Sequence, residues 1–189
     1  MTTRSMPVAS GNGRVVAGND GEYLVSDASS NEGWKALPLP AYFSAYDAGG
    51  GIDVSSGWTD ITWDTERKKA GVYTHSADSA VITIGKTSDF IFSFDYGCDM
   101  SSSSGNAPSV SACRLVTDTG GGYAEVAGTR AFAFHDGTDD GESSASVNNI
   151  ILSVTSGDAF KVQVQRFAGN DTILTVADAC RIFIQCIEE

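Results

Sequence analysis

The chain has 189 residues, of which 41% are hydrophobic and 10% aromatic, enough for one globular domain with its own core and a shorter additional segment. It carries 12 Lys and Arg against 24 Asp and Glu, a formal charge of −12. This shortage of cations excludes a nucleic acid partner held by clustered Lys and Arg, and it argues against binding to anionic membranes.

Targeting signals and cysteine usage point to a protein made in a reducing cytoplasm. No stretch approaches the ~20 apolar residues of a membrane span, and residues 1–7 lack the apolar run of a secretory signal. The cysteines show no C-x-x-C spacing. We therefore expect reduced, unbridged thiols, with Cys98 and Cys180 buried; the four positions are Cys98, Cys113, Cys180 and Cys186.

Residues 1–40 are rich in Gly, Asn, Asp and Ser and contain few apolar groups. They end in Leu37-Pro38-Leu39-Pro40, where each proline removes a backbone donor and favours an extended residue before it. The segment Gly18–Gly21 is a turn signal. We interpret residues 1–40 as an arm or small hairpin whose apolar residues are anchors for a partner; these are Val15, Val16, Tyr23, Leu24, Val25 and Trp34.

From residue 41 onward, short segments with alternating apolar residues are separated by turn residues. In the segment 90–98, for example, Phe90, Phe92 and Phe94 alternate with less apolar neighbours. This period of two, without a helical stripe, predicts an all-β jelly-roll sandwich in residues 41–189. Ten strands are expected, at 41–46, 59–64, 71–75, 81–84, 90–98, 110–117, 128–135, 145–155, 160–164 and 180–187.

The order of several motifs resembles the tumour-necrosis-factor-like jelly roll, which also forms the globular heads of complement-type proteins. The resemblance covers roughly residues 41–187. It departs from the family pattern in two places: Asp89-Phe90 stands where Gly-Tyr is usual, and the last strand lacks the family's glycine. The motifs that carry it are Phe43-Ser44-Ala45, Gly71-Val72-Tyr73, Phe90-Ile91-Phe92-Ser93-Phe94, Ser156-Gly157-Asp158-Ala159-Phe160-Lys161-Val162, and the final strand that ends at Ile187.

A second resemblance lies in the arm. The segment 19–27 (NDGEYLVSD), followed by Gly33-Trp34, resembles short segments that precede the head domain in phage fibre and virion-surface proteins. Together with the absence of a signal peptide, a collagen-like repeat or an anchor, this resemblance implies a tailed-phage virion protein. The implied location is the virion, assembled in the host cytoplasm.

Catalytic motifs were sought and none was found: the chain has no G-x-S-x-G, H-E-x-x-H, G-x-x-x-x-G-K-[ST] or G-x-G-x-x-G. His75 and His135 each lie at an expected strand end, where a histidine without converging partners is interpreted as a loop or interface residue. We therefore expect no enzyme activity, no cofactor and no metal.

Three other features are open to two interpretations. The segment Asp136–Glu142 has four carboxylates and two glycines in seven residues, but its spacing is not that of an EF-hand, so a solvated acidic loop is favoured over a calcium site. Arg67-Lys68-Lys69 is interpreted as an exposed basic turn, with an acidic neighbouring subunit or capsid surface as the alternative. Trp58 and Trp63, close to a Gly/Ser loop, stay ambiguous between core and sugar platform.

The functional prediction is a structural virion protein: a homotrimer that decorates the phage head, binds the major capsid protein or another virion protein, and stabilises the shell. In the last strand both faces are partly apolar, which a strand facing one core does not need. Phe183 and Ile187 are therefore expected at the trimer interface, as the resembled family implies. The alternative is the receptor-binding head of a head fibre or tail fibre.

Overall fold

The computed structural model describes residues 22–26, 32–36, 40–102, 108–136 and 141–187. The chain forms two units that divide between Leu39 and Pro40. In the first unit, β1 (Glu22–Ser26) pairs antiparallel with β2 (Glu32–Ala36). None of the described segments is a helix that could cross a bilayer.

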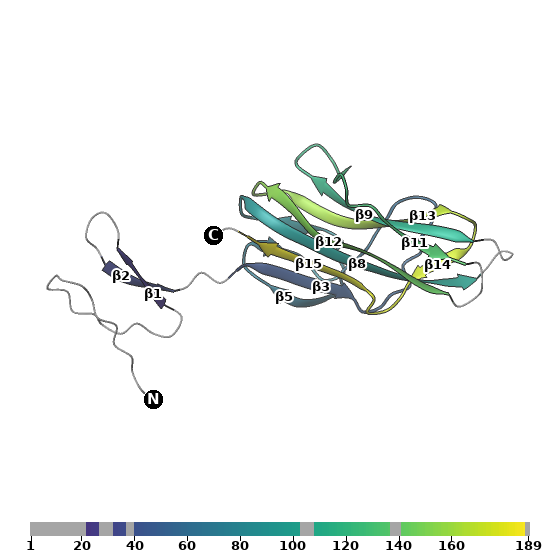
Figure 1. Ribbon diagram of the computed structural model, residues 1–189, viewed down its shortest axis with the longest axis horizontal. Coiled ribbons are helices and arrows are strands. Elements are labelled where there is room, and N and C mark those ends of the chain that lie inside the picture. The colour runs from purple at the N-terminus through teal and green to yellow at the C-terminus, as the bar shows by residue number, and fades with distance from the viewer. Residues whose placement is uncertain (1–21, 27–31, 37–39, 103–107, 137–140, 188–189) are drawn as a thin grey trace, which may run out of the picture. The chain divides into compact units, whose positions relative to one another are not determined.

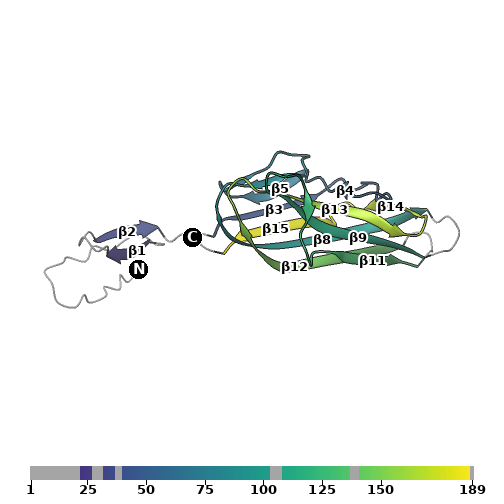
Figure 2. The same cartoon turned by 90° about the horizontal axis from the view of Figure 1, so that it is seen from above.

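The second unit is a sandwich of two antiparallel sheets stacked face to face (Figures 1 and 2). The six-stranded sheet has the order β12-β8-β15-β3-β5, with β14 also paired to β8. Its strands are β3 (Tyr42–Asp47), β5 (Thr65–Lys69), β8 (Ser88–Ser102), β12 (Glu142–Val154), β14 (Thr172–Thr175) and β15 (Cys180–Cys186).

The seven-stranded sheet has the order β10-β9-β13-β7-β6, and β11 and β4 pair with β9 and β13. Its strands are β4 (Thr59–Asp60), β6 (Tyr73–Thr74), β7 (Ile82–Ile84), β9 (Ser109–Asp118), β10 (Ala124–Glu125), β11 (Ala131–His135) and β13 (Ala159–Ala168).

The core lies between the sheets and is built from every second residue of the long strands. Phe92 of β8 packs on Phe160 of β13 with ring centroids 4.7 Å apart, which joins the two layers. Trp63 is fully buried, so the core interpretation of this residue is the correct one. Such interdigitation of alternating side chains is what holds an aligned sandwich together.

The cysteines belong to this core. All four lie within the described residues, buried and without a disulfide, so the expected burial of Cys98 and Cys180 is confirmed. Burial raises the pKa of Cys180 to about 12, although the hydrogen bond between its thiol and the Gly97 carbonyl acts in the opposite direction. The Cys180 thiol is therefore protonated and acts as a small apolar core group.

Two local expectations are wrong. Residues 67–69 do not form a turn; they end β5, an edge strand, which the alternation rule missed because a charged edge strand has no apolar face. The segment 59–64 shortens to β4 plus a bridge between Trp63 and Ser79. Two further short strands, β10 and β14, were not expected.

Candidate functional site: the outer face of the six-stranded sheet

The last strand separates its two faces sharply. In β15 the even-numbered positions are buried in the core, whereas Arg181 and Phe183 are exposed on the outer face. Phe183 keeps 37% of its surface exposed, and Ile187, just after the strand, keeps 44%. Both residues predicted for an interface therefore lie on the surface of the same sheet.

Small neighbours leave the Phe183 ring accessible. Phe183 lies between Ser44 of β3 and Ser93 of β8 in the strand register. Its only aromatic neighbour among the described residues is Tyr42, stacked with ring centroids 6.4 Å apart. Since its two neighbours across the strands are serines, the Phe183 ring is covered only in part, by Tyr42, among the described residues.

Further apolar residues extend this surface. Ile91 of β8 lies opposite Ile151 of the edge strand β12, and Ile151 is 62% exposed. On the other side, Ile91 lies opposite Gln185, which is itself opposite Tyr42. We call this set the apolar stripe: Tyr42, Ile91, Ile151, Phe183 and Ile187.

Sequence reasoning found two of the five stripe residues. Ile91 was recognisable, because it occupies the outward position between Phe90 and Phe92. Ile151 was not, because β12 contains a register shift between Val147 and Ile150, with Asn149 at φ 58°. Such a bulge changes which residues point outward, and simple alternation cannot locate it.

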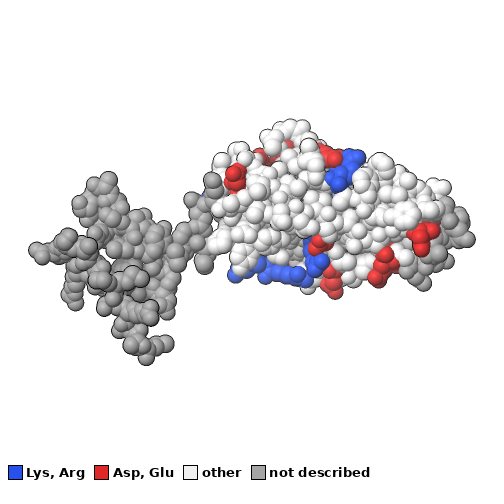
Figure 3. All heavy atoms as spheres, in the orientation of Figure 1, with Lys and Arg blue, Asp and Glu red and all other residues white. Residues whose placement is uncertain are grey.

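Ionic groups border the stripe. On β5, Arg67 lies over the Tyr46 ring at 4.4 Å, and Lys69 Nζ is 2.7 Å from Glu66 Oε1. On β8, Asp95 accepts a hydrogen bond from Ser146 and is 2.9 Å from Arg181. Figure 3 shows Lys and Arg side chains gathered along the lower border of this face, where β5 runs.

His75 is not an exposed loop residue. Its side chain is fully buried beside Phe43, with Nδ1 2.7 Å from Glu66 Oε1 and Nε2 3.0 Å from the Ser79 carbonyl. Burial opposes ionisation of Glu66, but hydrogen bonds from Lys69 and His75 outweigh it and lower the pKa of this carboxyl. The histidine thus joins the edge strand β5 to the loop after β6.

The second histidine is also buried. His135 Nε2 lies 3.5 Å from Cys98 Sγ and 3.3 Å from Ser111 Oγ, between the sheets. A Cys–His pair is the arrangement of a nucleophile and base, but burial raises the pKa of Cys98, and neither side chain is more than 2% exposed. This pair is therefore placed as part of the core.

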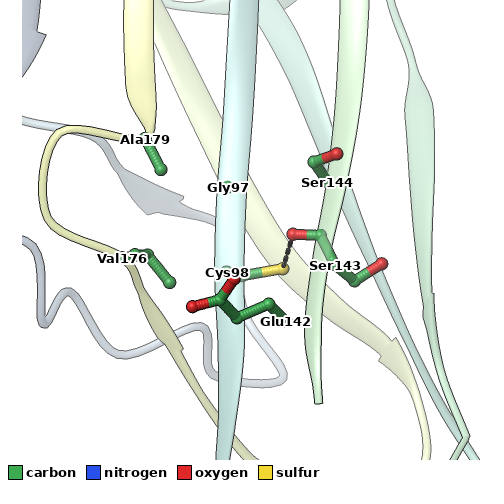
Figure 4. A pocket seen from close by; sticks show the side chains of 7 residues that line it. All are labelled: Gly97, Cys98, Glu142, Ser143, Ser144, Val176 and Ala179. Atoms are coloured by element: carbon green, nitrogen blue, oxygen red, sulfur yellow. Dashed lines mark hydrogen bonds between the residues drawn. The ribbon is translucent and has the colours of Figure 1, made fainter.

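A pocket of about 280 Å³ lies on the same outer face, where β8 and β12 meet the loop before β15 (Figure 4). Its lining includes Gly97, Glu142 and Ser144. Cys98 also lines the pocket, and its thiol donates a hydrogen bond to the Ser143 carbonyl, 3.5 Å away. No cluster of three or more His, Cys, Asp or Glu suited to a metal ion occurs in the described part of the chain.

The predicted anchors of the arm are only partly described. Val15, Val16 and the expected turn at 18–21 lie outside the described residues, as do residues 137–140 of the acidic segment. Tyr23, Leu24 and Val25 belong to β1 and Trp34 to β2, with Leu24 opposite Trp34 in the register. Their anchoring role stays a prediction.

No family model matches the chain, and no curated protein matches it. Solved structures do. Murine APRIL superposes with a TM-score of 0.56 at 9% identity, over 79% of this chain and all of that one. The fold is a tumour-necrosis-factor-like jelly roll.

Two further structures agree with this assignment. Eiger TNF from S. frugiperda superposes with a TM-score of 0.53 at 13% identity, covering 79% of this chain and 94% of that one. The globular domain of zebrafish complement 1qA gives 0.53 at 11% identity, covering 80% and 99%. The fold class predicted from the sequence is confirmed, and at these identities the likeness concerns the fold alone.

Proposed function

We propose that the chain forms a homotrimer and decorates the head of a tailed phage, where it bridges and stabilises the coat subunits. The observation that carries the assembly step is the apolar stripe on the six-stranded sheet. Isolated exposed apolar residues are ordinary, but several aromatic and branched side chains on one face, interrupted here by Gln185, are typical of a surface that another subunit covers.

The likeness in fold to the tumour-necrosis-factor and complement structures also supports the proposed assembly. A stable interface buries roughly 800 Å² on each partner, so the proposed contact extends beyond the stripe over the paired strands of this face. Phe183 and Tyr42 near its centre are the residue types that dominate binding energy in interfaces. The coarse function is thus structural or binding, and decoration is the specific proposal.

The oligomeric state is the first test. Sedimentation equilibrium of the purified chain at micromolar concentration should give three times the monomer mass. A monomer under these conditions would refute the assembly proposal and, with it, the role assigned to Phe183 and Ile187.

Attachment to the virion is assigned to residues 1–40. Fixing the backbone of each residue costs about 1–2 kcal/mol, which a segment with few apolar groups recovers by adding strands to a partner's sheet or packing on a neighbour. Deleting residues 1–33 should leave a β-rich trimer that no longer attaches to particles. Decoration by the truncated chain at the wild-type level would contradict this assignment.

One observation favours a second candidate, a receptor-binding head. Phe132, Phe134 and Phe167 are 52%, 62% and 56% exposed on the seven-stranded sheet, and Phe132 contacts Phe167 edge to face at 5.5 Å. They lie on β11 and β13 (Figure 1). An exposed apolar cluster of this kind supports the alternative proposal of a contact with a host molecule.

Imaging distinguishes the two candidates. Virions carrying a gold-labelled copy should show label spread over the head if the protein is a decoration protein. Label confined to the tail tip or to sparse fibres would favour receptor binding instead.

A further inference from the structure

The outer face of the six-stranded sheet is electrically asymmetric across its strands. The half made by β12 and β8 carries carboxylates, whereas the far edge, β5, carries cations. The carboxylates on the first half are Asp89, Asp95, Asp99 and Glu142. The cations on the second are Arg67, which lies over the Tyr46 ring, and Lys68, which lies opposite Ser44; Lys69 lies opposite the buried Phe43, on the inner side of the sheet. This contrast is unexpected in a chain of charge −12.

The acidic half has little internal compensation. Asp95 is paired with Arg181 at 2.9 Å, which is the one cation that β8, β12 and β15 contribute to this face within the described ranges. The Asp89 carboxylate accepts a hydrogen bond from the neutral Ser153 hydroxyl. The half therefore keeps a net negative charge.

The basic edge is also uncompensated. Lys69 forms an ion pair with Glu66. Arg67 and Lys68 are exposed, and neither has a carboxylate within ion-pair distance among the residues that the structure describes. Elsewhere on the sandwich, Arg114, Arg130 and Lys161 are all paired with carboxylates. Arg67 contacts the Tyr46 ring and Lys68 is exposed, so the basic edge keeps a net positive charge that no carboxylate of the described residues neutralises.

Register places the opposite charges at similar heights along the strands. One row across the sheet runs from Thr65 of β5 through Tyr46 and Arg181 to Asp95 and Ser146. Lys68 belongs to the adjacent row on the same face, opposite Ser44. Neighbouring same-face rows are about 7 Å apart, which is within the reach of a lysine side chain.

The two charged borders lie on opposite sides of the sandwich. β12 and β5 are the first and last strands of the six-stranded sheet, and Figure 2 shows them on opposite sides of the layers. In a ring of three identical subunits every contact is heterologous, so one side of a subunit meets the other side of the next. The basic border of each copy then faces the acidic border of its neighbour.

We infer that Arg67 and Lys68 of one copy dock against the acidic half around Asp95 and Ser146 of a second copy. This inference rests on the homotrimer proposed above and deepens it, because it states which edges meet. The apolar stripe supplies affinity, and the charges select the head-to-tail orientation. They also oppose a two-fold pairing in which β5 would face β5, because like charges would then meet.

Two substitutions at exposed positions test the inference. Lys68→Glu places a negative charge against the acidic half, and Ser146→Lys places a positive charge against the basic edge. Neither Lys68 nor the backbone at Ser146 contributes a core contact, so both variants should fold. Each should weaken trimerisation about tenfold per interface, as measured by sedimentation, because attraction is replaced by repulsion.

The double variant is the decisive measurement. Lys68→Glu combined with Ser146→Lys exchanges the two signs and should restore trimerisation to near the wild-type level. A matched control, Thr119→Glu with Ala127→Glu, makes the same change in net charge as Lys68→Glu but on exposed loops next to the seven-stranded sheet; it should leave the trimer unchanged.

The outcomes separate the inference from the function on which it rests. If the wild type is a trimer and the two single variants associate equally well, or the double variant is not rescued, the edge-to-edge docking is refuted while the trimer stands. If the wild type is a monomer, the proposed assembly itself fails. If salt weakens the wild-type trimer more than it weakens Lys68→Glu, the electrostatic contact is supported.

Discussion

The two outer faces of the sandwich differ in how far their charged side chains are paired within the subunit. On the seven-stranded sheet, Arg114 lies 3.9 Å from the Trp58 ring centroid and 2.8 Å from Glu125, and Arg130 also pairs with Glu125. On the six-stranded sheet, Lys68 has no such partner among the described residues, and Phe183 is covered only by Tyr42 at one side.

This difference indicates which outer face has its charged and aromatic side chains partnered within one subunit. The inner faces are alike, because both are apolar and alternate in the same way. The seven-stranded sheet satisfies the cations around Trp58 internally, so that this part of its surface needs no partner. The six-stranded sheet leaves part of its aromatic surface exposed and Lys68 without a carboxylate partner among the described residues, in agreement with the proposed contact with a second copy.

The largest effect is expected from a charge in the apolar stripe. Phe183→Asp would bury a carboxylate in the proposed interface, and an unpaired buried charge costs several kcal/mol. Trimerisation should weaken by a factor on the order of 100 or more at each interface, as measured by sedimentation.

The matched control for this prediction is Phe132→Asp on the other sheet. Phe132 is more exposed than Phe183, and the trimer should not change. Loss of the trimer in both variants, or in neither, would remove the distinction between the two faces.

A smaller effect is expected from crowding beneath the loop that precedes β15. A methyl group at Gly97 would lie 2.4 Å from the Ala179 Cβ, closer than real atoms approach. Gly97→Ala should therefore lower the free energy of unfolding by about 1–3 kcal/mol, measured by urea denaturation.

The control is Gly121→Ala, where the added methyl group meets no atom within 4 Å. That variant should stay within about 0.5 kcal/mol of the wild type. Equal effects at the two glycines would show that the 176–179 loop does not press on β8.

Each sheet contains one glutamate that accepts hydrogen bonds from two basic side chains, and acid should affect both. Hydrogen bonds from Arg130 and Arg114 lower the pKa of Glu125 against the cost of burial, and Lys69 and His75 lower that of Glu66. Each depressed pKa contributes stability that is present above about pH 4.5 and lost as the pH falls through the folded-state value.

The expected size is about 0.5–1 kcal/mol for each glutamate. It is measured as the change in unfolding free energy between about pH 7 and about pH 3 in the wild type, in Glu66→Gln and in Glu125→Gln. The variants should lose less stability on acidification than the wild type does. An identical pH dependence in all three would contradict the assigned pKa directions.

The smallest expected effect concerns the cysteines, which should behave alike on both sheets. Burial raises the pKa of Cys113 and of Cys180 to about 12, so neither is a thiolate at neutral pH. A thiol reagent should leave the native protein unlabelled and label four groups per chain after denaturation without reductant. A count of two or zero would reveal disulfides.

Sequence patterns predicted the parts of the fold that follow alternation. Strands such as β8 and β15 were located because apolar residues at every second position face the core. The basic strand β5 and the two-residue strand β10 were missed, because no apolar face marks them and backbone pairing with a neighbour decides their conformation.

The candidate surface was predicted in part for the same reason. Phe183 and Ile187 stood out as apolar residues on the wrong face of an otherwise well-defined strand. Tyr42 and Ile151 required the strand order and the bulge in β12, which are three-dimensional properties. The pairing of His75 with Glu66 likewise depends on two edge strands of different sheets that only the fold brings together.

The jelly roll begins and ends at the same pole. The Cys186 amide donates a hydrogen bond to the Ala41 carbonyl, and the Ile187 amide donates one to the Asp89 carbonyl. Ends that lie this close permit circular permutation. A short linker could join residue 187 to residue 41, with new ends opened in the exposed glycine turn at 120–122. In such a permuted molecule the new termini would lie in the β9–β10 turn, and a peptide fused to either terminus would extend from there. The strand pairing of the head would be unchanged.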